Sequence, residues 1–227
     1  MASKPRETFF SDNKLGPCPY VISGDVSKTK KGLIVLQEWW GLNDQIQSEA
    51  AMIAEKGNFV TIVPDLYRGK VAIDNETAGH YMGDLDWAGA VHDIKGAARK
   101  LKAIGCEKVG VTGFCMGGAL SLAAAALLKE IQASAPFYGI PSDELADVSK
   151  ITIPLQCHFG ANDAVEGFSC PKSQAKLKEK LDLGKVKYEF HSYQAGHAFT
   201  NATSQGFHKE SCELAIGRMV DFMNKNL

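Results

Sequence analysis

Short apolar runs alternate along the chain with longer segments in which apolar residues recur every three or four positions. The short runs are typical of buried strands, and the longer period is typical of amphipathic helices. The predicted strands cover residues 33–37, 59–63, 109–112, 133–138, 153–159 and 186–193. The predicted helices include one that begins at Asn43 or Asp44, and others over about 84–104, 119–128, 171–181 and 208–224. This alternation predicts an α/β fold with a mostly parallel central sheet and helices on both of its faces.

The pattern also indicates how the chain is organised. Residues 186–193 alternate between polar and apolar side chains, which favours a strand near the edge of the sheet. Residues 65–83 are rich in turn formers, and no internal repeat, low-complexity segment or domain linker interrupts the pattern. We therefore expect a single domain over residues 1–227, in which residues 1–16 form a loosely packed N-terminal extension.

Composition narrows the function classes. The 227 residues are 45% hydrophobic and 22% charged, with a net charge of −1 and no basic block. These values are typical of a globular protein and argue against nucleic acid and anionic membranes as partners. The first residues lack the apolar region of a secretory signal peptide, and no apolar run is long enough to span a bilayer. We expect a cytoplasmic protein.

Cysteine and histidine spacing gives no metal signature. The six cysteines form no C-x-x-C pair, and the six histidines form no H-E-x-x-H motif. In an intracellular chain of this length we expect reduced thiols that mostly act as packing groups, and no metal site.

One cysteine is the exception, because it lies in the most informative motif of the chain. Residues 113–118 read GFCMGG and stand between an apolar run and an Ala- and Leu-rich segment. A strand, a Gly-x-Cys-x-Gly turn and a helix form a nucleophile elbow, here with Cys115 as the nucleophile. At the N-terminus of that helix the dipole would favour a thiolate. The alternative is a glycine-rich turn that holds an inert, buried cysteine.

A cysteine nucleophile needs a base, and the base needs an orienting group. Asp163 and His197 each follow a predicted strand, where parallel sheets carry their functional loops. The chain order of nucleophile, acid and histidine, with room for a strand–helix unit in each gap, is that of α/β-hydrolase triads. His158 and His191 fall inside strands and His208 begins a helix, so they are weaker candidates for the base.

A carboxylate follows the first core strand, which in this architecture adjoins the elbow strand. Glu38 stands between apolar residues and two tryptophans, so burial would raise its pKa unless it found a partner. That partner is either the Cys115 thiol or, in a purely structural role, backbone amides. The amides of Trp39 and Met116 would form the two donors of an oxyanion hole.

Four motifs together make the chain resemble the dienelactone hydrolase (carboxymethylenebutenolidase) family of α/β-hydrolases. They are QEWWGLN at 37–43, PDLYRG at 64–69, GFCMGG at 113–118 and GHAF at 196–199, and the resemblance runs from about residue 18 to 224.

The resemblance implies a mechanism. Cys115, Asp163 and His197 would be the triad, and Glu38 would hold the thiol and help activate it. Cys115 would attack an ester or enol-lactone to form a thioester acyl-enzyme, which water then hydrolyses. The resemblance implies a small-molecule ester or lactone as the substrate and no cofactor. We expect a monomer.

The chain departs from the family where the substrate is held. By the resemblance, arginines hold the carboxylate of dienelactone, one of them four residues after the catalytic histidine. That position is Asn201 here, and residues 71–87 contain no arginine or lysine. Losing two charge-assisted contacts would weaken the binding of an anion by several kcal/mol. A neutral or larger ester is therefore at least as good a candidate, and Asn201, His80 and Tyr81 are the candidate substrate-binding residues.

The sequence thus predicts a cysteine-dependent hydrolase of carboxylic esters or enol-lactones. Two other functions use the same features. A non-catalytic α/β-hydrolase scaffold would bind a small molecule without forming an acyl-enzyme, and a thiol redox sensor would use Cys115 without esterase activity.

Overall fold

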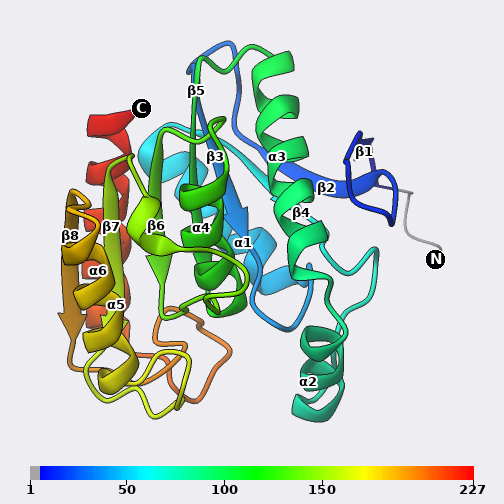
Figure 1. The fold of residues 1–227 in the computed structure, drawn as a ribbon. Coiled ribbons are helices and arrows are strands. Elements are labelled where there is room, and N and C mark those ends of the chain that lie inside the picture. The colour runs from blue at the N-terminus through cyan, green and yellow to red at the C-terminus, as the bar shows by residue number, and fades with distance from the viewer. Residues whose placement is uncertain (1–5) are drawn as a thin grey trace.

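A twisted eight-stranded sheet runs through the computed structural model, which describes residues 6–227 (Figure 1). The strand order is β1-β2-β4-β3-β5-β6-β7-β8. The six strands from β3 to β8 are parallel, whereas β2 is antiparallel to both of its neighbours, β1 and β4. The strands are β1 (Thr8–Phe9), β2 (Cys18–Ser23), β3 (Lys31–Leu36), β4 (Val60–Pro64), β5 (Lys108–Phe114), β6 (Ala133–Phe137), β7 (Leu155–Gly160) and β8 (Tyr188–Tyr193).

Helices cover both faces of this sheet. In Figure 1, α3, α4 and α5 lie on the viewer's side, and α1 and α6 lie behind the sheet. The helices are α1 (Asp44–Gly57), α2 (Asn75–Gly83), α3 (Trp87–Ala103), α4 (Met116–Leu127), α5 (Pro171–Leu183) and α6 (Lys209–Asn226), with a short 3₁₀ helix, η1 (Val148–Lys150). The structure confirms the single-domain α/β fold and its mostly parallel sheet.

The prediction for residues 65–83 was incomplete, because this segment contains α2. Asp74 caps that helix by accepting a hydrogen bond from the amide of Thr77, at 2.8 Å. Strands β1 and β2 were not predicted either. The long helix begins at Trp87 rather than near residue 84, because Asp86 forms its N-cap with the amide of Gly89.

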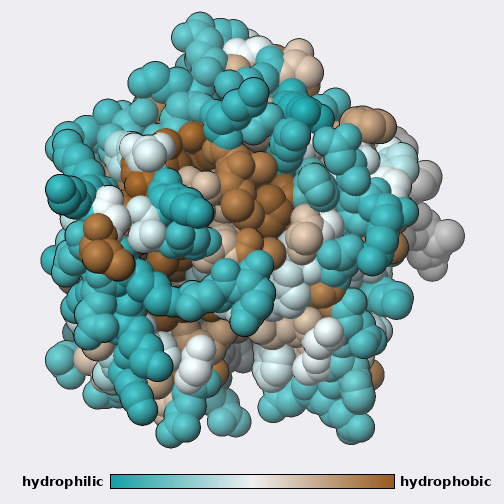
Figure 2. All heavy atoms as spheres, viewed as in Figure 1, coloured by the Kyte–Doolittle hydropathy of each residue, from teal (hydrophilic) through white to brown (hydrophobic). Residues whose placement is uncertain are grey.

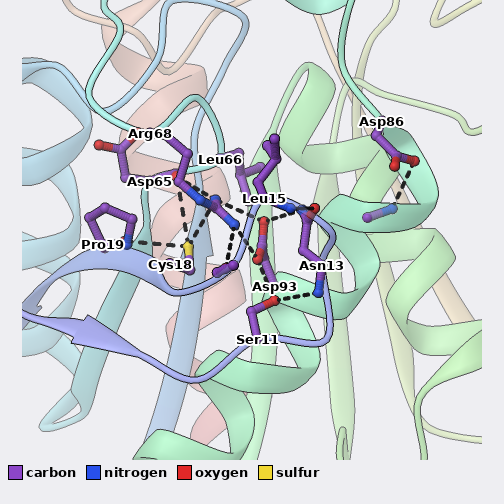
Figure 3. Close-up of polar contacts among 12 residues, drawn as sticks. Ser11, Asn13, Leu15, Cys18, Pro19, Asp65, Leu66, Arg68, Asp86 and Asp93 are labelled. Atoms are coloured by element: carbon purple, nitrogen blue, oxygen red, sulfur yellow. Dashed lines mark hydrogen bonds and ion pairs between the residues drawn. The ribbon is translucent and has the colours of Figure 1, made fainter.

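The N-terminal segment is held more firmly than the expected loose extension, although residues 1–5 lie outside the described part of the chain. Asp93 on α3, which is fully buried, accepts hydrogen bonds from Ser11 at 2.5 Å and Asn13 at 2.9 Å (Figure 3). Arg68 faces the same carboxylate with both terminal nitrogens, at 2.8 and 3.0 Å. We call these four residues the Asp93 cluster, and it ties residues 11–13 to α3 and to the loop after β4.

Apolar side chains fill both sides of the sheet, as the alternation of strands and helices requires. The visible face is mostly hydrophilic, with hydrophobic side chains gathered between α3 and α4 (Figure 2). All six cysteines are free thiols, and four of them are buried. None of the helices within residues 6–227 has both the length and the apolar character needed to cross a membrane.

Candidate active site

Cys115 occupies a sharp turn between β5 and α4. Its backbone has φ 54° and ψ −114°, which is a strained conformation for a residue with a side chain. The turn brings strand and helix so close that a Cβ atom on Gly113 would lie 2.4 Å from the carbonyl oxygen of Gly117. A Cβ atom on Gly117 would lie 2.4 Å from the carbonyl oxygen of Leu36. Glycine is therefore required on both sides of Cys115.

Two backbone amides face the Cys115 sulfur. They belong to Met116, the first residue of α4, and to Trp39, which follows β3. Strands β3 and β5 are paired as far as Leu36 and Gly113, and this pairing brings the two turns together. These are the two amides predicted to form an oxyanion hole.

Cys115 is almost enclosed, with 8% of its surface exposed. Burial raises the pKa of its thiol, and the negative charges of Glu38 and Asp163 raise it further. Hydrogen bonds from the two amides act in the opposite direction. The thiol is consequently protonated at neutral pH, and a nearby group must take its proton before the sulfur can attack.

The structure brings Asp163 and His197 together, as their chain order predicted. The Nδ1 atom of His197 lies 2.8 Å from Oδ2 of Asp163 and 3.1 Å from the hydroxyl of Ser169. The Asp163 side chain is fully buried, and its other oxygen accepts a hydrogen bond from the amide of Val165. An Nδ1 proton shared with a buried carboxylate leaves Nε2 free to accept a proton.

The competing histidines have other partners. His158 is buried and hydrogen-bonds Tyr193 at 2.8 Å and Gln156 at 2.9 Å, and burial lowers its pKa well below the usual value. His191 contacts the neighbouring Glu189, and His208 caps the N-terminus of α6. Among the histidines of residues 6–227, only His197 is paired with a buried carboxylate.

Glu38 is buried beside the elbow, with 4% of its surface exposed. One carboxylate oxygen accepts a hydrogen bond from the Asn201 amide at 2.5 Å, and the other accepts one from the Tyr138 hydroxyl at 3.3 Å. Burial raises the pKa of Glu38, whereas Asn201, the charge of His197 and Tyr138 lower it. The hydrogen bonds of Glu38 thus go to two side chains rather than to the Cys115 thiol or backbone amides, and its negative charge raises the pKa of that thiol.

The three candidate substrate-binding residues do not lie together, because His80 and Tyr81 are in the lining of one cavity and Asn201 is buried beside Glu38. His80 and Tyr81 are on α2 and line a cavity of about 420 Å³ together with Arg68 and Lys70. Neither Cys115 nor His197 lines that cavity. Asn201 is buried and donates to Glu38, so its amide is already engaged inside the protein.

A second cavity, of about 510 Å³, has Phe168 in its wall, and none of Cys115, Asp163 and His197 lines it. The Phe168 ring forms part of its wall and lies 6.3 Å from the His197 ring, measured between centroids. The wall is mainly apolar, and Glu144 is its one charged residue. The remaining lining residues are Met82, Trp87, Ile140, Pro141, Ser142, Leu145 and Gly167.

Three polar residues next to Glu38 were not predicted: Tyr138, Thr200 and Glu49. Tyr138 follows β6 with φ 37°, and its hydroxyl lies 2.6 Å from that of Thr200. Thr200 lines the same cavity as Glu49, a buried residue of α1. Tyr138 has a signal in the sequence, since it stands at the carboxyl end of a predicted strand like the other site residues.

The site contains no arrangement suited to a metal. Within the described residues 6–227, no group of three or more histidine, cysteine, aspartate or glutamate side chains is placed to hold an ion. The chemistry available is that of a thiol, an imidazole, two carboxylates and two amide donors.

Comparisons with known proteins lead to one family. Residues 20–227 match the model of the dienelactone hydrolase family. Over 134 residues the chain is 37% identical to Protein usf of Aquifex pyrophilus, a match that covers 55% of this chain and 58% of the relative. It is 33% identical to a putative carboxymethylenebutenolidase of Aquifex aeolicus over 54% of this chain and 57% of the relative. The match thus spans little more than half the length of these two curated relatives.

Other matches cover more of the chain. A carboxymethylenebutenolidase of Pseudomonas putida is 26% identical over 204 residues, which is 84% of each chain. The crystal structure of a putative dienelactone hydrolase from Klebsiella pneumoniae has a TM-score of 0.81 at 22% identity and covers 96% of this chain and 97% of its own. A dienelactone hydrolase-like promiscuous phosphotriesterase from metagenomic libraries has a TM-score of 0.79 at 21% identity, with 97% of each chain covered.

Proposed function

Because the chain belongs to the dienelactone hydrolase family, we propose that it hydrolyses carboxylic esters or lactones with Cys115 as the nucleophile. The observation that carries this proposal is the elbow itself. Cys115 stands in a strained turn with two amides facing its sulfur, and the charge of Asp163, the partner of His197, acts on its thiol. Acyl transfer requires a nucleophile, a base and an oxyanion hole in this arrangement.

The proposed reaction has two stages. In the first, the thiol gives up its proton to Glu38, the sulfur forms a bond with the carbonyl carbon, and the amides of Trp39 and Met116 stabilise the oxyanion. The bond to the leaving oxygen then breaks, the proton taken from the thiol passes to that oxygen, and a thioester remains. In the second stage, His197 takes a proton from water as the water oxygen attacks the thioester carbon. The C–S bond then breaks, the acid leaves, and the proton on His197 returns to the Cys115 sulfur. Asp163 holds the imidazole in the required tautomer.

The surroundings support a neutral substrate. The cavity that Phe168 lines has a mainly apolar wall with a single acidic residue, and no lysine or arginine of the described residues lines it. Asn201 stands where the family resemblance implies an arginine, and its amide donates to Glu38. A carboxylate in this cavity would lose its hydration without gaining a cation, and this raises its free energy. We therefore propose neutral esters or lactones rather than dienelactone itself.

The test is turnover of neutral p-nitrophenyl esters and enol-lactones by the wild type and by Cys115→Ala. We expect the alanine variant to lose turnover by a factor on the order of 10³ or more. Cys170→Ala is the matched control, because Cys170 is a partly exposed thiol whose pKa is lowered by its contact with Ser173, and it could react with activated esters by itself. Undiminished turnover in Cys115→Ala would refute the mechanism.

A second measurement tests the substrate class and the alternatives. An enol-lactone bearing a carboxylate is compared with its methyl ester, and we expect kcat/KM to favour the neutral compound at least about tenfold. Intact-mass spectrometry after mixing with an activated ester should show an acyl group on Cys115. A scaffold that only binds its ligand would show no adduct, and a redox sensor would show reversible oxidation of Cys115 without hydrolysis.

A further inference from the structure

A fully buried serine hydroxyl makes a second contact with the imidazole of His197. The hydroxyl oxygen of Ser169 lies 3.1 Å from Nδ1 of His197, the same atom that lies 2.8 Å from Oδ2 of Asp163. Ser169 is fully buried and stands two residues before the start of α5. The mechanism proposed above gives this hydroxyl no role.

The protons on these three groups determine the direction of both contacts. An ionised carboxylate only accepts hydrogen bonds, so the short contact with Asp163 requires a proton on Nδ1 of His197. Nδ1 then has no lone pair to offer, and the Ser169 oxygen is a second acceptor for the same N–H group. The other oxygen of Asp163 is already engaged, because it accepts a hydrogen bond from the amide of Val165 at 3.0 Å. The Nδ1–H group is thus shared between a carboxylate and a hydroxyl oxygen.

Hydrogen bonds hold the backbone of Ser169 from both sides. Its amide donates to the carbonyl oxygen of Val165 at 3.0 Å, and the amide of Val165 in turn donates to Asp163. Its carbonyl oxygen accepts a hydrogen bond from the side-chain amide of Gln174 on α5 at 2.8 Å. The same amide nitrogen donates to the carbonyl oxygen of Gly160 at the end of β7, also at 2.8 Å. The hydroxyl is therefore already in place and does not have to be ordered when the imidazole becomes charged.

We propose that Ser169 is a positioning residue that holds the Nδ1–H group of His197 as a second acceptor and thereby stabilises the charged imidazole while the thioester is hydrolysed. This inference rests on the function proposed above, in which His197 accepts a proton from water in the second stage and Glu38 accepts the thiol proton in the first. The water proton moves to Nε2, the Nδ1 proton stays in place, and no proton passes through Ser169.

The effect of Ser169 is expected in one of the two stages. Protonation of Nε2 makes the Nδ1–H group of His197 more polar, and hydrogen bonds with a charged donor are roughly twice as strong as neutral ones. The Ser169 oxygen therefore favours the transition state of thioester hydrolysis over the resting enzyme. It has no comparable effect on the attack of the Cys115 sulfur, because His197 stays neutral in that stage.

The experiment measures the two stages separately on a neutral p-nitrophenyl ester. The initial burst of p-nitrophenol gives the rate of acylation, and intact-mass spectrometry follows the loss of the acyl group from the enzyme. The variants are Ser169→Ala, which removes the second acceptor, and Ser169→Thr, which retains a hydroxyl group. Ser134→Ala is the matched control, because Ser134 is also fully buried and its hydroxyl donates to the carbonyl oxygen of Ser121, away from His197.

We expect Ser169→Ala to hydrolyse the thioester about fivefold more slowly, which corresponds to the difference between a hydrogen bond to a charged group and one to a neutral group. Its acylation rate should stay within about twofold of the wild type, so that kcat and KM fall together and kcat/KM is unchanged when hydrolysis limits turnover. Ser169→Thr should recover most of the loss, and Ser134→Ala should match the wild type. Unchanged thioester hydrolysis in Ser169→Ala would overturn the inference, and so would an equal loss in both stages, which indicates a merely structural role.

A spectroscopic measurement tests the same hydrogen bond without any substrate. The Nδ1–H proton of His197 is observed by NMR of the ¹⁵N-labelled ring and is assigned by its absence in His197→Gln. Exchange of this proton with solvent requires the N–H group to leave both acceptors. The loss of one acceptor should therefore make exchange roughly fivefold faster in Ser169→Ala than in the wild type and Ser134→Ala. Equal exchange rates would overturn the inference.

The two measurements separate this inference from the proposed function. If exchange is faster in Ser169→Ala and the wild type hydrolyses no ester, the proposed function fails while Ser169 remains a positioning residue of His197. If esters are hydrolysed and Ser169→Ala matches the wild type in both exchange and thioester hydrolysis, the inference fails alone.

Discussion

Replacing Gly117 with alanine should disable the elbow with a modest effect on the fold. The added Cβ atom would lie 2.4 Å from the carbonyl oxygen of Leu36 and 2.7 Å from that of Gln37, whereas ordinary contact begins near 3.4 Å. Both neighbours are backbone atoms, so the end of β3 and the start of α4 must separate by about 1 Å. This separation moves the Trp39 amide away from the Cys115 sulfur. Because a misplacement of about 1 Å can cost about 10²-fold in rate, we expect kcat/KM to fall by that order.

The assay compares neutral ester hydrolysis and thermal unfolding for Gly117→Ala with those for Gly217→Ala. Gly217 lies within α6, where an added Cβ atom meets nothing within 4 Å, and the change should stabilise the protein by about 0.5–1 kcal/mol without loss of activity. Gly117→Ala should be destabilised by about 1–3 kcal/mol, as for other overpacked sites. A Gly117→Ala protein with kcat/KM within about threefold of the wild type would refute the geometric argument.

Three further predictions follow from buried charges. Arg68→Met leaves the carboxylate of Asp93 buried without its cation, so urea unfolding should show a loss of about 3–5 kcal/mol, and a loss below about 1 kcal/mol would contradict this account of the Asp93 cluster. Folding raises the pKa of Glu49 from 4.5 to about 8, so the folded state binds more protons than the unfolded state between these values and the wild type loses stability as pH rises. Glu49→Gln lacks this dependence, and its unfolding free energy should gain on the wild type by up to about 1.4 kcal/mol per pH unit between pH 5 and 8; parallel curves would contradict the raised pKa. Asp163→Asn should lower kcat by about 10³-fold or more by changing the tautomer of His197, with little change in KM. A smaller loss of kcat in steady-state kinetics would contradict this role of Asp163.

The parts of the site that could be predicted from the sequence depend on local geometry. Gly113 and Gly117 are needed because the chain approaches itself within a few residues of Cys115, and that requirement is visible as a motif. Asp163 and His197 could be placed because each follows a buried strand, and parallel strands bring their carboxyl ends to one edge of the sheet. The hydrogen bond between them is then a consequence of topology.

The parts that could not be predicted depend on polar contacts between distant segments. Residues 65–83 hold α2 through a cap at Asp74, but a helix this short in a segment rich in turn formers has a weak periodic signal. Ser11 and Asn13 appear as ordinary loop residues, and their role is set by Asp93, about eighty positions later. Partners this remote leave no pattern in either segment.

Glu49 shows most clearly what the sequence can and cannot predict. Its position in the helical pattern predicts that it is buried, but not which residues surround it. It lies three residues after Ile46 and four before Ile53, on the stripe of α1 that faces the core. A carboxyl group at such a position must be protonated or paired, since an isolated buried charge is too costly. The helical period does not identify the surroundings of Glu49, because Thr200 and Cys212, which line the same cavity, come from other segments. Burial and the charge of Glu38 together raise the pKa of Glu49 to about 8, so the protonation of Glu49 depends on a loop that the periodic pattern of α1 does not describe.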